Sequence, residues 1–152
     1  MNSSTSLVLD PSVAIKWYVN EEDSQIAVGF QKWIQETTGR LIVPPLFFDE
    51  IANVLWKKET LRKEIFPKAA KQILWEILQL PLQVYLDRHE MLPKALEIAT
   101  NARISIYDAI YLATAIQNQA IFITADDRLV KKLISTPVAS SVVAMDCWTQ
   151  LK

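Results

Sequence analysis

Four acidic residues lie within or next to apolar segments of this sequence, and their carboxylates could act together in chemistry. They are Asp10, Glu50, Asp108 and Asp126. Asp108 is the only charged residue between Arg103 and Asp126, in a segment whose apolar spacing predicts a core helix. A lone carboxylate in such a segment is costly to bury without compensation. Either Ser105 engages it as part of a helix cap, or it faces other carboxylates around a cation.

Convergence of these carboxylates would favour a bound metal ion, because close carboxylates repel one another and some would take up protons. Oxygen ligands favour the hard cations Mg²⁺ or Mn²⁺ over zinc. Such an ion lowers the pKa of a bound water and neutralises charge on a phosphoryl oxygen. This chemistry suits hydrolysis of a phosphodiester bond.

Several other chemistries lack their residues in this sequence. His89 is the sole histidine and lies in a charged stretch, so it is predicted to be on the surface. The two glycines, Gly29 and Gly39, exclude a glycine-rich phosphate loop. Gly39 instead reads as the glycine that ends a helix. Cys147 is the only cysteine, which excludes an intramolecular disulfide and fits a reducing cytoplasm.

The apolar pattern predicts short strands that alternate with helices in the 152-residue chain. The expected strands are Leu7–Leu9, Leu41–Val43, Leu82–Leu86, Ala120–Ile123 and Ser141–Ala144, and the expected helices include Leu46–Lys58, Pro67–Gln79, Leu92–Ala99 and Ser105–Ile116. This alternation indicates a parallel sheet covered on both faces. We therefore expect an α/β protein, a three-layer α/β/α sandwich of four to five parallel strands in a single domain over residues 1–152.

The predicted sheet places acidic residues where ligands bind in such folds, beyond the carboxyl ends of the strands. Asp10 and Asp126 follow the first and fourth expected strands. Glu50 lies one turn into the helix that leaves the second strand, and Asp108 is near a helix start. Convergence is therefore compatible with the pattern, although the pattern does not prove it.

The acidic residues stand in four short motifs, which follow one another along the chain: Asp10-Pro11-Ser12, Glu50-Ile51-Ala52-Asn53-Val54-Leu55, Ser105-Ile106-Tyr107-Asp108-Ala109-Ile110-Tyr111-Leu112-Ala113 and Thr124-Ala125-Asp126. With these motifs the chain resembles PIN-domain ribonucleases, most closely the VapC-type toxins of toxin–antitoxin pairs. The resemblance spans about Leu7 to Leu133, with the order and spacing of the motifs in agreement. It implies a Mg²⁺- or Mn²⁺-dependent endoribonuclease, often a homodimer that an antitoxin inhibits.

The resemblance also implies site residues. Its catalytic and metal-binding acids fall on Asp10, Glu50, Asp108 and Asp126, and its polar helpers fall on Ser12, Asn53 and Thr124. Asp127 is an alternative to Asp126, which matches the motif better. Glu50 is preferred to its neighbour Asp49 because it shares a helix face with Asn53.

The expected partners are an RNA substrate, a second copy of the chain and a small antitoxin protein. Net charge is −1, so no basic coat exists, but Arg103, Arg128 and Lys131 are weak candidates for contacts with the RNA backbone. Basic residues also gather at Lys57–Lys58, where a solvated helix face is an equal alternative. No apolar run approaches the roughly 20 residues of a membrane helix, and no signal peptide is evident.

Two alternatives remain at this stage. A catalytically silent PIN-like module that binds a partner is one, because the five tryptophans are many for this length and aromatic residues favour interfaces. An aspartate-based phosphotransfer domain is a weaker one. The dehalogenase type of that class wants a second aspartate two residues after Asp10, where this chain has Ser12.

Overall fold

Five parallel strands form the centre of the structure, a computed structural model that describes residues 5–37 and 39–152. The strands are β1 (Leu7–Leu9), β2 (Leu41–Val43), β3 (Leu82–Val84), β4 (Ile121–Thr124) and β5 (Val142–Ala144). Their order in the sheet is β3-β2-β1-β4-β5, and every neighbouring pair is parallel. The predicted parallel sheet is confirmed, with strand ends within two residues of expectation.

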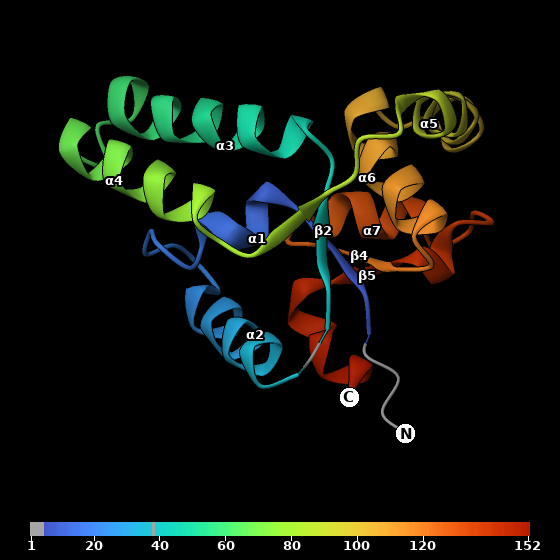
Figure 1. The fold of residues 1–152 in the computed structure, drawn as a ribbon, viewed down its shortest axis with the longest axis horizontal. Helices are drawn as coiled ribbons and strands as arrows, with labels where there is room; N and C mark the ends of the chain where they lie inside the picture. The colour runs from blue at the N-terminus through green and yellow to red at the C-terminus, as the bar shows by residue number, and fades with distance from the viewer. Residues whose placement is uncertain (1–4, 38) are drawn as a thin grey trace.

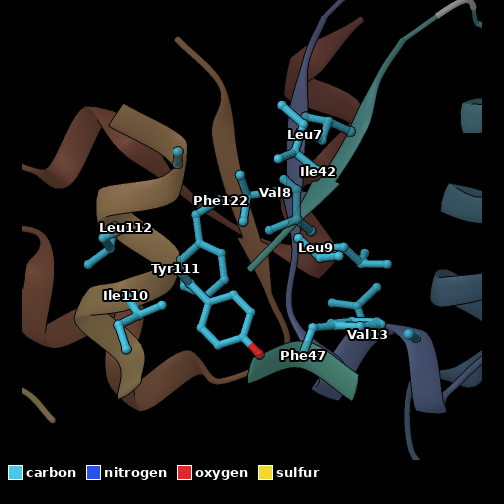
Figure 2. Close-up of a cluster of buried hydrophobic side chains, with 14 of the residues drawn as sticks. Leu7, Val8, Leu9, Val13, Ile42, Phe47, Ile110, Tyr111, Leu112 and Phe122 are labelled. Carbon is cyan, nitrogen blue, oxygen red and sulfur yellow. The ribbon is translucent and has the colours of Figure 1, made fainter. Parts of the chain in front are cut away.

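Helices cover the sheet and connect its strands (Figure 1). They are α1 (Pro11–Ile15), α2 (Ser24–Glu36), α3 (Leu46–Trp56), α4 (Pro67–Leu78), α5 (Arg88–Ala102), α6 (Ile106–Gln117) and α7 (Asp127–Leu133), with a π-helical turn η1 (Lys57–Leu61) and 3-10 turns η2 (Ala139–Ser141) and η3 (Met145–Leu151). Figure 2 shows the strands between α6 on one side and α1 on the other. The expected sandwich of helices, sheet and helices is confirmed.

Helix α6 is the central helix of the core. Its residues from Ala109 to Ala115 are all buried, because the helix packs against β1, β2 and β4 on one side and against α5 on the other. Leu7, Val8 and Leu9 of β1 are buried in the sheet between α6 and α1, with their side chains alternating between the two faces (Figure 2). Burial on both sides explains why α6 is apolar nearly all round, where the sequence indicated one apolar face.

Helices α3 and α4 form an arm that projects beyond the sheet, with the two helices side by side (Figure 1). The turn η1 extends α3, which the sequence predicted to end near Lys58. That lysine is only 3% exposed and makes ion pairs with Glu21 and Glu64. Lys58 is therefore neither part of a solvated face nor free to contact RNA, and the arm is tied to the segment between α1 and α2.

One local prediction was wrong. Gly39 does not cap a helix, since α2 ends at Glu36 and Gly39 has no positive φ. A side chain there would meet the carbonyl oxygen of Thr5 at 2.5 Å.

The helix predicted at Leu92–Ala99 is present and longer than expected, as α5. Its buried face is formed by Met91, Ala95 and Ile98, whereas Leu92 and Leu96 are exposed.

The strand order creates a reversal beside β1. The chain crosses from β1 to β2 and β3 on one side, and β4 and β5 lie on the other. Ligand sites in parallel sheets form where such crossovers diverge, beyond the carboxyl ends of the strands. Asp10 occupies this position.

No helix in the described part of the chain has the length and apolar character needed to cross a bilayer.

Candidate active site

Asp10 is held at the carboxyl end of β1 by its neighbours on both sides. It caps α1, with Ser12 donating to its carboxylate from the backbone N at 3.5 Å and from Oγ at 2.9 Å. Thr124 Oγ1 donates a further short hydrogen bond to Asp10 Oδ2. This contact follows from the sheet register, because Leu9 pairs with Ile123 and the next residues of β1 and β4 are therefore adjacent.

The same hydroxyls connect Asp10 to the loop after β4. Ser12 Oγ accepts a hydrogen bond from Ala125 N at 3.1 Å, and Thr124 Oγ1 accepts one from Asp126 N at 3.0 Å. Asp126 in turn caps α7 through Oδ1, which accepts from the backbone N–H groups of the following turn. A continuous hydrogen-bonded chain therefore joins Asp10 to the backbone that positions Asp126.

Asp127 is the first residue of α7 and, like Asp126, is exposed. It acts on the thiol of Cys147, whose pKa is raised chiefly by a hydrogen bond to Asp146, then by burial, and least by the charge of Asp127. The backbone N–H of Asp126, and not its carboxylate, joins the hydrogen-bonded chain from Asp10. The choice of Asp126 over Asp127 therefore stays a prediction from the sequence motif.

Glu50 and Asp108 approach Asp10 from helices on different parts of the fold. Glu50 Oε2 accepts a hydrogen bond from the Tyr111 hydroxyl, which comes from the core side. Asp108 lies in the first turn of α6, where Ser105 Oγ donates to its Oδ2 at 2.8 Å and accepts from its backbone N at 3.0 Å. The predicted cap by Ser105 is confirmed, and it does not exclude the second role for Asp108, because the other carboxylate oxygen accepts nothing from Ser105.

The charges of neighbouring carboxylates affect the pKa values of Asp10 and Glu50. Burial raises the pKa of Asp10 from 3.8 to about 6, against the lowering effect of the Thr124 and Ser12 hydrogen bonds, and the Glu50 charge raises it further. Burial also raises the pKa of Glu50, and the charges of Asp108 and Asp49 add to the effect. Asp10, Glu50 and Asp108 therefore share one region, and their ionised forms repel each other.

Tyr111 was not among the residues predicted from the sequence. It is 2% exposed, and burial and the adjacent Glu50 charge raise its pKa well above the ordinary value, so the hydroxyl keeps its proton. A usable signal did exist. Tyr111 lies three residues after Asp108, on the same helical face, and a phenol within an apolar helix needs an acceptor.

The chain matches one known protein family over most of its length. Residues 7–133 of the chain match the PIN domain family, a span that includes Asp10, Glu50, Asp108 and Asp126. The protein belongs to the PIN domain family. No curated protein sequence matches the chain.

Solved structures share this PIN fold at low sequence identity. The protein PAE2754 from Pyrobaculum aerophilum has a TM-score of 0.66 and 20% identity, covering 96% of this chain and 93% of its own. A toxin–antitoxin complex from Klebsiella pneumoniae has a TM-score of 0.63 and 14% identity, covering 91% and 97%. VapBC2 from Rickettsia felis, bound to a DNA fragment from its promoter, has a TM-score of 0.65 and 12% identity, covering 92% and 98%.

The remaining predicted residues of the PIN domain lie around this centre. Asn53 is one turn beyond Glu50 on α3 and is exposed. Arg103, Arg128 and Lys131 are also exposed, and the carbonyl oxygen of Arg103 accepts a hydrogen bond from Lys132 Nζ. An open hollow of about 460 Å³ is lined by Ser12, Ala125, Asp126, Asp127 and Arg128. The basic side chain of Arg128 thus borders the acidic loop.

Within residues 5–37 and 39–152, no three acidic, histidine or cysteine side chains are already close enough to hold one metal ion. The chemistry of the donors nevertheless fits a hard cation, because Asp10 and Glu50 have raised pKa values and lie among carboxylates. Burial is the main cause of those raised pKa values, and a divalent ion would offset it together with the smaller repulsion between the carboxylates.

Proposed function

We propose that this PIN domain is a metal-dependent endoribonuclease and the toxin of a type II toxin–antitoxin pair. The observation that carries the proposal is the electrostatic coupling of Asp10, Glu50 and Asp108 at the carboxyl end of the central strands. These residues come from three separate elements, since Asp10 follows β1, Glu50 lies in α3 and Asp108 lies in α6. Family membership supports the proposal because PIN domains are generally nucleases.

Mg²⁺ or Mn²⁺ is the proposed cofactor, with Asp10, Glu50, Asp108 and Asp126 as the residues that would hold it. When bound, the ion would supply an acidic water and a counter-charge for the scissile phosphate. Ser12 and Thr124 keep the Asp10 carboxylate in one orientation through their hydroxyl groups. Glu50 would hold the ion or orient the attacking water, and Asn53 would reach a phosphate oxygen from the exposed face of α3.

The proposed RNA path follows the basic residues near the acidic loop. Arg128 lines the hollow next to Asp126, and Lys131 lies one helical turn further along α7. Arg103 ends α5 close to α7, since its carbonyl oxygen accepts from Lys132. Exposed cations at and near α7 would counter the repulsion between the carboxylates and the phosphate backbone.

The proposed protein partner is a small antitoxin. One of the similar structures, from Klebsiella pneumoniae, is described as a toxin–antitoxin complex, and another is VapBC2 from Rickettsia felis. The α3–α4 arm of this chain leaves Trp56, Phe66 and Trp75 exposed at 49%, 82% and 65%. Exposed aromatic residues of this kind are typical of binding surfaces. A homodimer and a cytoplasmic location are part of the same proposal.

Cleavage assays test the nuclease directly. The purified protein is incubated with RNA and Mg²⁺ or Mn²⁺ and compared with Asp108→Asn, which keeps the shape of the side chain and the Ser105 contact. We expect the cleavage rate of Asp108→Asn to be at least about a hundredfold lower than that of the wild type, in the range for loss of a catalytic group. The matched control is Asp23→Asn, at an exposed site whose left-handed backbone asparagine tolerates. Equal cleavage by wild type and Asp108→Asn would refute the mechanism.

The silent binding module remains the second candidate, because the aromatic residues of the arm are exposed whether or not the site is active. Calorimetry separates the two readings. Mn²⁺ binding that Asp108→Asn weakens supports the nuclease, whereas no binding by the wild type favours the silent module. The phosphotransfer alternative has no further support, since Ser12 hydrogen-bonds Asp10 where that class wants a second carboxylate.

A further inference from the structure

The hydroxyl group of Tyr111 reaches the acidic centre from inside the core. The ring stacks on Phe122, with the centroids 5.4 Å apart and the planes at 18°. It comes from α6, whose residues around it are buried. Figure 2 shows the hydroxyl oxygen pointing away from Phe122 and toward the helix that carries Phe47, which is α3. A phenol in this position has its ring fixed by packing and its oxygen directed at the site.

The acceptor is Glu50 Oε2, which belongs to an element 61 residues away in the chain. The Glu50 side chain is half-buried and has several rotatable bonds, whereas the Tyr111 ring cannot follow a moving carboxylate without disturbing its stack on Phe122. The rigid partner therefore sets the position of the flexible one. Asp108 lies three residues before Tyr111 on the same face of α6, so this one helix positions both side chains.

We propose that Tyr111 is a positioning residue that binds one carboxylate oxygen of Glu50 and directs the other toward the cation and its water. The inference rests on the proposed function and assigns to this chain a support for Glu50 that comes from the core. Oε2 is occupied by the phenol, which leaves Oε1 as the oxygen available for binding. Such supporting hydrogen bonds typically change metal affinity or activity by about 10- to 100-fold.

The test compares Tyr111→Phe, which removes one oxygen and keeps the stacked ring, with Tyr107→Phe on the same helix. Tyr107 is 58% exposed and provides the matched control. Titration calorimetry with Mn²⁺, without RNA, should give about tenfold weaker binding for Tyr111→Phe. Its kcat for RNA cleavage should fall by a similar factor with little change in KM. Tyr107→Phe should match the wild type in both measurements.

A double-mutant cycle with Glu50→Ala identifies the route of the effect. If Tyr111 acts through Glu50, adding Tyr111→Phe to Glu50→Ala changes Mn²⁺ affinity no further. Additive losses would overturn the inference. So would a Tyr111→Phe protein with a lower unfolding midpoint but wild-type Mn²⁺ affinity and kcat, because that pattern describes a core residue only.

These outcomes separate the inference from the proposed function. A wild-type protein that neither binds Mn²⁺ nor cleaves RNA removes both. A wild type that does both, beside a Tyr111→Phe variant that equals it, removes only the positioning role of Tyr111.

Discussion

The burial of Asp10 predicts that its carboxylate destabilises the protein in the absence of a cation. The pKa is raised from 3.8 to about 6, chiefly by burial. At about 1.4 kcal/mol per pKa unit, this difference lowers the free energy of unfolding by about 3 kcal/mol above pH 6. Asp10→Asn approximates the neutral acid. We therefore expect the variant to be roughly 1–3 kcal/mol more stable than the wild type at pH 8 in a chelator.

The pH dependence gives the sign of this effect. Between pH 6 and 3.8 the folded protein takes up a proton at Asp10 while the unfolded chain remains ionised, so acidification stabilises the wild type through this window. The greater stability of Asp10→Asn should therefore disappear by about pH 3.8. Saturating Mn²⁺ at pH 8 should make the wild type more stable than Asp10→Asn. Urea unfolding at each pH measures this. A variant that is less stable at pH 8, by an amount independent of pH, would refute the reasoning.

Two further predictions concern the scaffold. Lys58→Met should lower the free energy of unfolding by about 1–3 kcal/mol, because Glu21 loses the closer of its two lysine partners at a partly buried site and Glu64 loses its ion pair with Lys58. The matched change Lys57→Met on the exposed side should cost little, and urea titration of both variants measures the difference. Gly39→Ala should cost roughly 1–3 kcal/mol, since the added Cβ would meet the Thr5 carbonyl oxygen at 2.5 Å; an unchanged thermal midpoint would contradict this contact.

The most deeply buried strands were predictable from the sequence. β1, β2 and β4 are short, mainly apolar runs, and their parallel arrangement follows from the helices between them. Helix ends were harder to predict. The turn η1 continues α3 because Lys58 finds Glu21 and Glu64, and this contact depends on the tertiary position of the α1–α2 segment.

The composition of the acidic centre was partly predictable. Asp10 and Thr124 are 114 residues apart in the chain, and their contact depends on β1 pairing with β4, which the strand sequences alone do not specify. The family resemblance brought Thr124 into the prediction, whereas local pattern did not. Tyr111 was missed because its spacing is equally typical of an ordinary core residue, and only the tertiary approach of Glu50 distinguishes it.

The central claim is that the carboxylates of Asp10, Glu50, Asp108 and Asp126 gather around one divalent cation. A crystal soaked in Mn²⁺, with anomalous scattering to identify the metal, tests it most directly. The account predicts a peak with carboxylate oxygens of Asp10 and Asp108 about 2.1 Å away, in the range for small hard cations. A protein that binds Mn²⁺ only elsewhere on its surface, with these side chains unchanged, would contradict it.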